Sequence, residues 1–288
     1  MRPPRLTGRP ADALRSAWRR AVGRRLPGLD RAAHRAYFQW ERLVFAVRLC
    51  SDLRSLVAYL HVESRWAPAG PVAVRARPLG GERVWLRPRT TDPVMLRDTF
   101  RDNVHPPPPE IAARGVRRIV DLGANIGLTM ADNARAFPGA RLLGVELDPG
   151  NAEVARRNLA PWGDRCEVLQ GAVWITDGSV RYDDTGQEYG FHVVEDGVGA
   201  PTRALSMETI LSHVPSGERV DYLKMDVEGV ESRLLSGAAA GWAARVDSIG
   251  LQVHDPYTLE DCARDLAALG FTPRVDRRRV NFIVGVRR

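Results

Sequence analysis

The sequence VDLGANIG at residues 120–127 decides the fold of this chain of 288 residues. A short apolar run ends at two glycines, and a helical pattern follows from about Gly127 to Phe137. A buried strand that turns sharply into a helix is the first unit of an open α/β sheet, which binds its ligand at the carboxyl ends of its strands. Because glycine has no Cβ, we expect the turn at Gly123 and Gly127 to approach a nucleotide-like cofactor closely.

A second segment, DYLKMDVEGVE at residues 221–231, follows about a hundred residues later. It also reads as a buried strand, which here ends in carboxylates before a helix begins. From Val116 onward, strand-like and helix-like segments alternate, and this predicts a mostly parallel sheet with helices on both faces. Asp148 followed by Pro149 is typical of a helix start. The predicted strands are 118–122, 141–146, 167–169, 180–182, 222–225 and 248–253, with 272–275 and 280–286 as a closing antiparallel pair.

The first 109 residues have a different pattern. Residues 1–29 are rich in arginine and proline, which favours partial disorder, and apolar residues recur at helical spacing within 30–64. Alternating residues over 72–89 predict a β-hairpin, a helix is expected over 93–100, and the prolines of 106–109 form an extended link. We therefore predict a basic helical extension at 1–70, a hairpin, helix and proline-rich link at 71–109, and a ligand-binding domain at 110–288.

The net charge of +7 is concentrated in the N-terminal part of the chain. Residues 1–60 hold 13 arginines and four acidic residues, a net charge of +9, whereas residues 61–288 carry −2. Such an arm either forms a solvated face or contacts nucleic acid, an anionic membrane or an acidic partner. A membrane contact would be peripheral, because no apolar run approaches the roughly 20 residues that cross a bilayer.

The cysteines indicate a cytoplasmic protein. Cys50, Cys166 and Cys262 are few, odd in number and widely spaced, which predicts reduced thiols and not a disulfide framework or a zinc site. The sequence after Met1 begins with arginine and proline and lacks the apolar stretch of a secretory signal.

Several polar residues are placed to hold the cofactor. Asn125 stands where a dinucleotide fingerprint has glycine, and its amide can bind polar groups such as an amino-acid tail. Glu146, at the end of the second predicted strand, can accept hydrogen bonds from both hydroxyls of a ribose. Asp121 can attract a cationic end of the cofactor, and Gly171 with Ala172 forms a lip over an adenine. With Gly123 and Gly127, these residues make up the predicted cofactor site.

The two segments also resemble a known family. Residues 120–127 resemble motif I of class I methyltransferases, and residues 221–231 resemble the Lys-x-Asp-x-Glu-Gly-x-Glu signature of the FkbM family. The likeness covers about residues 83–288, Asn158 included. It implies a Rossmann-like α/β fold with a mostly parallel seven-stranded sheet, S-adenosylmethionine as cofactor, and O-methylation of sugars, polyketides and related secondary metabolites or glycans.

The residues around the second segment suggest how an oxygen would be methylated. The reaction needs a positioned acceptor, a site that excludes water and the removal of a proton. His254 is the candidate base, because imidazole titrates near neutral pH, and a structural histidine is the alternative. Lys224 and Asp226 lie two apart on one strand and share a face, where they could orient the acceptor hydroxyl. Lys224 with a lowered pKa is a second candidate base.

The acidic residues after position 225 leave a metal site open. Asp226 and Glu228, with Glu231, could hold Mg²⁺, which would polarise a hydroxyl. Alternatively, these carboxylates stabilise the beginning of the next helix, and Glu231 fits that role best.

Other functions compete with methylation of a small-molecule or glycosyl hydroxyl. A methyltransferase for ribose 2′-hydroxyls of nucleic acid would suit the basic arm, but residues 61–288 carry −2 and show no basic groove with aromatic residues. Asn125 and residues 221–231 argue against a dehydrogenase, and the intact set of candidate residues argues against a non-catalytic binding protein. Residues 186–202 and the N-terminal layer are expected to shape the acceptor pocket, and the pattern identifies neither the acceptor nor the oligomeric state.

Overall fold

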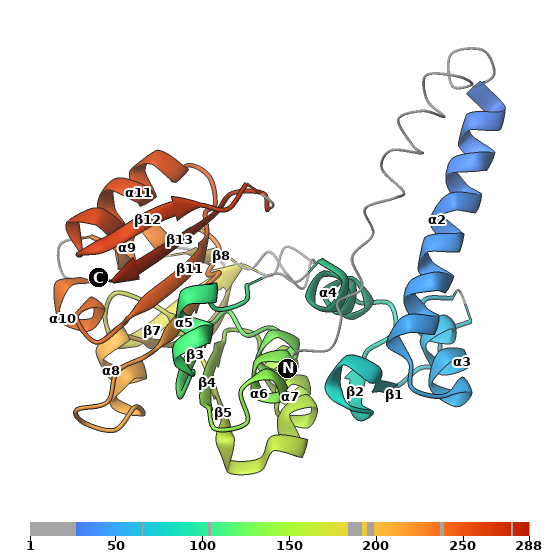
Figure 1. Cartoon of the computed structure of the whole chain (residues 1–288), viewed down its shortest axis with the longest axis horizontal. Helices are drawn as coiled ribbons and strands as arrows, with labels where there is room; N and C mark the ends of the chain where they lie inside the picture. Colours follow the sequence, from blue (N-terminus) through green and yellow to red (C-terminus); the bar gives the residue numbers. More distant parts are fainter. Residues whose placement is uncertain are drawn as a thin grey trace. The chain divides into compact units, whose positions relative to one another are not determined.

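The computed structural model describes residues 27–64, 66–102, 105–183, 192–194, 199–236, 239–277 and 279–287, with side chains from residue 36 onward except at 102, 183 and 192–194. The chain divides into two compact units, Met1–Asn103 and Val104–Arg288, and each is treated by itself (Figure 1). The predicted division into 1–70, 71–109 and 110–288 stays a prediction. The disorder predicted for 1–29 lies outside the described residues, apart from 27–29, which belong to a helix, and residues 1–26 of the basic arm also lie outside them.

The first unit contains helices and the expected hairpin. The predicted helical segment 30–64 is interrupted, because Asp52 caps a new helix by accepting a hydrogen bond from the Ser55 backbone N at 2.8 Å. Neither α2 nor any other helix in the described part of the chain is both long and apolar enough to cross a membrane. The elements are α2 (Pro27–Leu49), α3 (Leu53–Val62), β1 (Val72–Ala76), β2 (Glu82–Leu86), α4 (Asp92–Arg97) and a π-helical turn (Asp98–Asp102).

The second unit contains a seven-stranded sheet with the order β12-β13-β11-β10-β3-β4-β5. Only β13 runs antiparallel to its neighbours, so the sheet is mostly parallel, as the sequence and the family resemblance predict. The predicted strand boundaries are confirmed to within a few residues. The strands are β3 (Arg118–Leu122), β4 (Arg141–Glu146), β5 (Cys166–Gln170), β10 (Tyr222–Met225), β11 (Ser248–Gln252), β12 (Phe271–Val275) and β13 (Phe282–Arg287).

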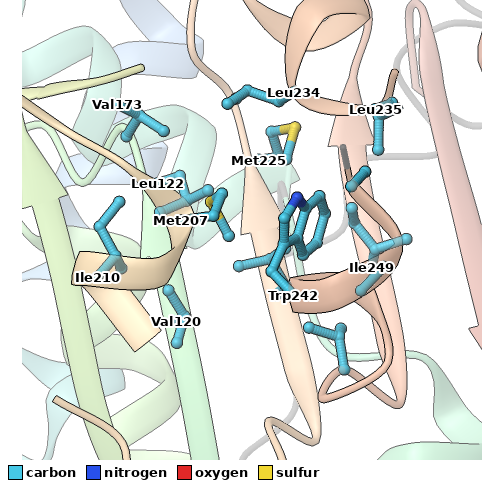
Figure 2. Packing of buried hydrophobic residues seen from close by; sticks show 14 of the residues in the cluster. Val120, Leu122, Val173, Met207, Ile210, Met225, Leu234, Leu235, Trp242 and Ile249 are labelled. Atoms are coloured by element: carbon cyan, nitrogen blue, oxygen red, sulfur yellow. The ribbon is translucent and has the colours of Figure 1, made fainter. Parts of the chain in front are cut away.

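Helices cover both faces of this sheet. On one face, Leu143 and Val145 of β4 join a cluster with Trp242 and other buried side chains, part of which is shown in Figure 2. On the other face, Gly144 leaves room for Met130, because a Cβ there would lie 2.5 Å from the Met130 sulfur. The helices are α5 (Pro109–Arg114), α6 (Leu128–Ala136), α7 (Pro149–Leu159), α8 (Met207–Ser212), α9 (Glu231–Leu234), α10 (Ala240–Ala243) and α11 (Leu259–Ala268).

A small second sheet follows β5, and the sequence predicted only one of its strands. Its order is β6-β9-β7-β8, in which β6 pairs with β9 in parallel and β7 pairs with both β8 and β9 in antiparallel fashion. Of the segment 186–202, which was expected to shape the acceptor pocket, only 192–194 and 199–202 are among the described residues. The strands are β6 (Ala172–Val173), β7 (Gly178–Asp183), β8 (His192–Val194) and β9 (Ala200–Leu205).

Candidate active site

The candidate site forms where the carboxyl ends of β3, β10 and β11 lie side by side. Val120 pairs with Leu223, and Leu223 pairs with Ile249, so segments about a hundred residues apart become neighbours. Loops after adjacent parallel strands meet at one edge of the sheet. Residues 120–127 and residues 221–231 are therefore brought together at one edge of the sheet.

The loop after β3 depends on its first glycine. Gly123 has a φ of +80°, a left-handed conformation that side chains rarely adopt. A Cβ at this position would lie 2.0 Å from the backbone oxygen of Asp226. The backbone N atoms of Gly123 and Ala124 both donate to the Val145 carbonyl, at 3.0 and 2.9 Å. The glycine thus lets the loop pack directly on the segment that follows β10.

Glu146 ties this loop to the next one. Its side chain is buried, and Oε2 accepts a hydrogen bond from the Asn125 backbone N at 2.7 Å. Oε1 accepts from the Asp148 backbone N at 3.0 Å, and Asp148 caps α7 as predicted. Burial raises the pKa of Glu146 against the opposing effect of these hydrogen bonds. The carboxylate therefore shapes both loops, and its expected contact with a ribose stays a prediction.

Two asparagines complete the loop. The Asn125 side chain accepts a hydrogen bond from the Ile126 backbone N at 2.7 Å, so its oxygen stabilises the loop that contains it. Asn158 of α7 is fully buried and donates from Nδ2 to the Ile126 carbonyl at 2.9 Å. Asn158, which is part of the family resemblance, thus stabilises the glycine loop through this hydrogen bond.

Replacing Asn158 by alanine should destabilise the protein by about 1–3 kcal/mol, because a buried carbonyl loses its donor and a cavity is left. Urea unfolding, followed by circular dichroism, measures this change. Replacement of the exposed Glu153 on the same helix is the control and should have an effect below about 0.5 kcal/mol. Equal midpoints for the two variants would contradict the role given to Asn158.

Lys224 is buried beneath the glycine loop. Its Nζ donates to the Gly123 carbonyl at 2.6 Å and lies 2.8 Å from Oδ1 of Asp121. Burial alone would lower the pKa of Lys224, but the carboxylates of Asp121 and Asp226 outweigh it, and the pKa is raised. Lys224 was considered from the sequence as a base with a lowered pKa, and the direction of that predicted pKa shift is therefore wrong. The ammonium holds the loop and two carboxylates.

Asp121 is buried opposite this ammonium. Its Oδ2 accepts no hydrogen bond in the structure, and burial raises its pKa even though Lys224 opposes the shift. The expected attraction of a cationic cofactor group by Asp121 stays a prediction. The carboxylate lies deep in the fold and already pairs with Lys224.

Gly171 and Ala172 lie where β5 leads into the small sheet. The Gly171 backbone N donates to the Glu146 carbonyl at 2.9 Å, and a Cβ on Gly171 would lie 2.8 Å from the Arg203 carbonyl. Ala172 is buried and pairs with Ala204. Both residues therefore join the two sheets, and their contact with an adenine stays a prediction.

Asp226 lies between three nitrogen atoms. Its Oδ2 is 3.5 Å from Nε2 of His105 and 3.9 Å from Nζ of Lys224, and its Oδ1 is 3.6 Å from Nε2 of His254. Burial raises the pKa of Asp226, but these three groups outweigh burial and hold the pKa well below its usual range. Asp226 therefore carries a negative charge at neutral pH.

His254 follows β11 and is surrounded by carboxylates. Its Nδ1 is 2.5 Å from Oε1 of Glu231, and its Nε2 is 3.7 Å from Oε2 of Glu228. Burial lowers the pKa of His254, but Glu231, Glu228 and Asp226 outweigh it and raise the pKa to about 9. The expectation that this imidazole titrates near neutral pH is thus wrong, and its assignment as a base stays a prediction.

Sequence reasoning missed two residues of this group. Glu231 was assigned to helix stabilisation, yet its side chain is fully buried and bonds to His254. His105 was not considered at all. Its backbone carbonyl accepts from the Tyr222 hydroxyl at 3.3 Å, and its ring lies edge-on to Phe282. Burial lowers the pKa of His105. The spacing of Glu231 in the signature was a usable signal, whereas nothing in the sequence around His105 indicated a role.

A family model described as the methyltransferase FkbM domain matches residues 121–271, about half of the chain. This range begins at Asp121 and includes all the candidate site residues named from the sequence.

Shorter matches connect the chain to individual methyltransferases. The O-methyltransferase imqG of Aspergillus flavus is 42% identical over 60 residues, which cover 20% of this chain and 24% of that protein. The tRNA1(Val) (adenine(37)-N6)-methyltransferase of Porphyromonas gingivalis is 37% identical over 71 residues, which cover 22% of this chain and 28% of that protein. The chain thus spans about a quarter of the length of these relatives.

Among solved structures, CalS10 with bound SAM, an amino pentose methyltransferase from Micromonospora echinaspora, shares 14% identity. The match has a TM-score of 0.39 and covers 62% of this chain and 87% of that one.

Proposed function

Because this chain belongs to the FkbM methyltransferase family, we propose that it is an S-adenosylmethionine-dependent O-methyltransferase for a hydroxyl of a small molecule or glycosyl group. The position of Asp226 carries the proposal. Its backbone oxygen lies against Gly123 of the cofactor loop, while its carboxylate lies 3.6 Å from His254. One residue therefore joins the predicted cofactor loop to the ionisable groups that a hydroxyl acceptor needs.

The residues around the glycine loop fit the proposed cofactor. Glu146 offers a carboxylate at the end of β4, and its Oε2 has a lone pair beyond the one used by Asn125, whereas Oε1 accepts from both Asp148 and Asn151. The buried Oδ2 of Asp121 accepts no hydrogen bond from the described part of the chain, and the carboxylates after β10 add negative charge. When bound, the cofactor supplies a methyl group on a cationic sulfur, which such a negative environment attracts.

The groups at the ends of β10 and β11 fit a hydroxyl acceptor. An alcohol oxygen must lose its proton during the transfer, and the negative charge that develops on this oxygen must be stabilised. Asp226 is negatively charged and can accept a hydrogen bond from the acceptor hydroxyl. Lys224 is fixed by Gly123 and Asp121, so it sets the position of the loop and of Asp226.

Titration of the purified protein with S-adenosylhomocysteine in a calorimeter tests the cofactor. We expect a Kd in the micromolar range for the unchanged protein and at least about tenfold weaker binding for Glu146→Gln. Glutamine supplies one acceptor oxygen where the carboxylate supplies two, so either the Asn125 or the Asp148 amide loses its partner. Glu153→Gln, on the surface of α7, is the matched control and should bind as the unchanged protein does.

Absence of S-adenosylhomocysteine binding, or a preference for NAD, would refute the cofactor. Methyl transfer from labelled S-adenosylmethionine to hydroxylated glycosides and polyketides, compared with their amino analogues and with RNA, then tests the acceptor class. Labelling of only the amines or only the RNA would refute the hydroxyl of a small molecule.

A further inference from the structure

Three side chains at the ends of β10 and β11 place ligand atoms around a common point. Oδ1 of Asp226 and Oε2 of Glu228 lie 3.6 and 3.7 Å from Nε2 of His254, and the three ligand atoms all lie within 4.8 Å of one another. Ligands bound at about 2.1 Å to one ion stand about 3.0–3.4 Å apart. The three side chains are partly exposed, so an ion can reach them, and small rotations bring them to these separations.

A fourth side chain, Glu231, is buried behind the imidazole. It is fully buried, its Oε1 lies 2.5 Å from Nδ1 of His254, and its Oε2 has no hydrogen-bond partner among the residues that the structure describes. A carboxylate on one ring nitrogen keeps the proton there and turns the other nitrogen toward a metal, which is the usual support of a ligating histidine. Stabilising the start of α9 would not require complete burial of this carboxylate. The same contact that stabilises a protonated His254 would also support an imidazole whose Nε2 has exchanged its proton for a metal ion.

The charge balance also favours a cation. Asp121, Asp226, Glu228 and Glu231 are four carboxylates within one connected group, and the positive charges that contact them are those of Lys224 and of His254 when its imidazole is protonated. That ammonium is already held by the Gly123 carbonyl and by Asp121. A divalent ion beside Asp226 and Glu228 would take the place of the proton on Nε2 of His254 and would keep positive charge among these carboxylates.

We propose that Asp226, Glu228 and His254 bind one divalent transition-metal ion, with Glu231 positioning the imidazole. Two carboxylates and one imidazole suit Mn²⁺, Fe²⁺, Co²⁺ or Zn²⁺, whereas Mg²⁺ and Ca²⁺ prefer oxygen ligands alone. The set therefore differs from the all-carboxylate Mg²⁺ site that the sequence left open. Three protein ligands leave positions for other oxygens, and an ion here would lower the pKa of an acceptor hydroxyl. This last role rests on the proposed function, but the binding of the ion does not.

Titration of the EDTA-treated full chain with MnCl₂, followed by the electron paramagnetic resonance signal of free Mn²⁺, tests the site without cofactor. We expect one ion per chain with a Kd of about 10 µM or tighter. His254→Ala and Glu228→Gln should each weaken binding at least about tenfold, and Glu231→Gln by about 10–100-fold. His213→Ala and Glu260→Gln, both away from this group, are the matched controls and should bind as the unchanged protein does.

Thermal unfolding of each variant separates loss of the site from loss of the fold. The proposal is overturned if the unchanged protein binds no Mn²⁺, if the folded His254→Ala and Glu228→Gln variants bind it equally well, or if millimolar Mg²⁺ displaces it. Titration with S-adenosylhomocysteine keeps the two proposals apart. If the protein binds Mn²⁺ but not S-adenosylhomocysteine, only the methyltransferase proposal is refuted. If it binds S-adenosylhomocysteine but not Mn²⁺, only the metal site is refuted.

Discussion

Replacement of Gly123 by alanine is expected to weaken binding of S-adenosylhomocysteine by at least about 100-fold, which corresponds to about 2.7 kcal/mol. The added Cβ would lie 2.0 Å from the backbone oxygen of Asp226, and neither atom belongs to a flexible side chain. The loop must therefore move away from the segment after β10. Such a movement also breaks the contact between the Gly123 carbonyl and Lys224 and displaces the amide that Glu146 holds. Calorimetric titration measures the effect.

Gly217→Ala is the matched control for this change. Gly217 has a φ of +82°, close to the +80° of Gly123, but a Cβ there meets nothing within 4 Å. Both variants carry the strain of a left-handed alanine, about 1 kcal/mol, and only Gly123→Ala adds the collision. We expect Gly217→Ala to keep the original affinity. If Gly123→Ala also keeps it, the glycine loop does not form the cofactor site.

Replacement of Lys224 by methionine is expected to destabilise the protein by about 3–5 kcal/mol, because the buried Asp121 and the partly exposed Asp226 lose their counter-ion. For a unit of this size, the change corresponds to a Tm lower by about 10 °C. Asp121 is the more affected partner, since its Oδ1 lies 2.8 Å from the ammonium and its Oδ2 accepts no hydrogen bond from any described residue. Differential scanning calorimetry measures the shift.

Arg264→Met provides the comparison for Lys224→Met. Arg264 also contacts two carboxylates, those of Asp261 and Asp265, but its side chain is 66% exposed. Exposed pairs of this kind contribute about 0–1 kcal/mol, so the Tm should change by no more than about 3 °C. Similar changes in Tm for the two variants would show that burial of Lys224 does not increase its contribution to stability.

The parts of the fold that local sequence determines were predictable. The glycines of residues 120–127 require the turn that follows β3, and Asp148 before Pro149 marks the start of α7. The alternation of strand-like and helix-like segments predicted the strands of the main sheet, and its closing antiparallel pair was predicted from the last two strand-like segments. In each case the cause lies within a few residues of its effect, so no knowledge of distant contacts was needed.

The remaining features depend on contacts between distant residues. The strands β6 and β8 have two and three residues, and they exist only through pairing with β9 and β7. The pKa of His254 is set by carboxylates 23 to 28 residues earlier in the chain, so its chemical type alone suggested the wrong titration range. Glu231 and His105 join the site in the same way, through burial that no short segment encodes.

The pairing of β3 with β10 has a consequence for how the chain folds during synthesis. The glycine loop rests on Asp226 and Lys224, so in a growing chain this loop lacks its support until Asp226 has left the ribosome. Closing a loop of about a hundred residues carries an entropic cost, and contacts of such long range tend to form late. A ligand of this site therefore cannot guide the early steps of folding. By binding only the finished sheet, it would raise the population of native protein by mass action.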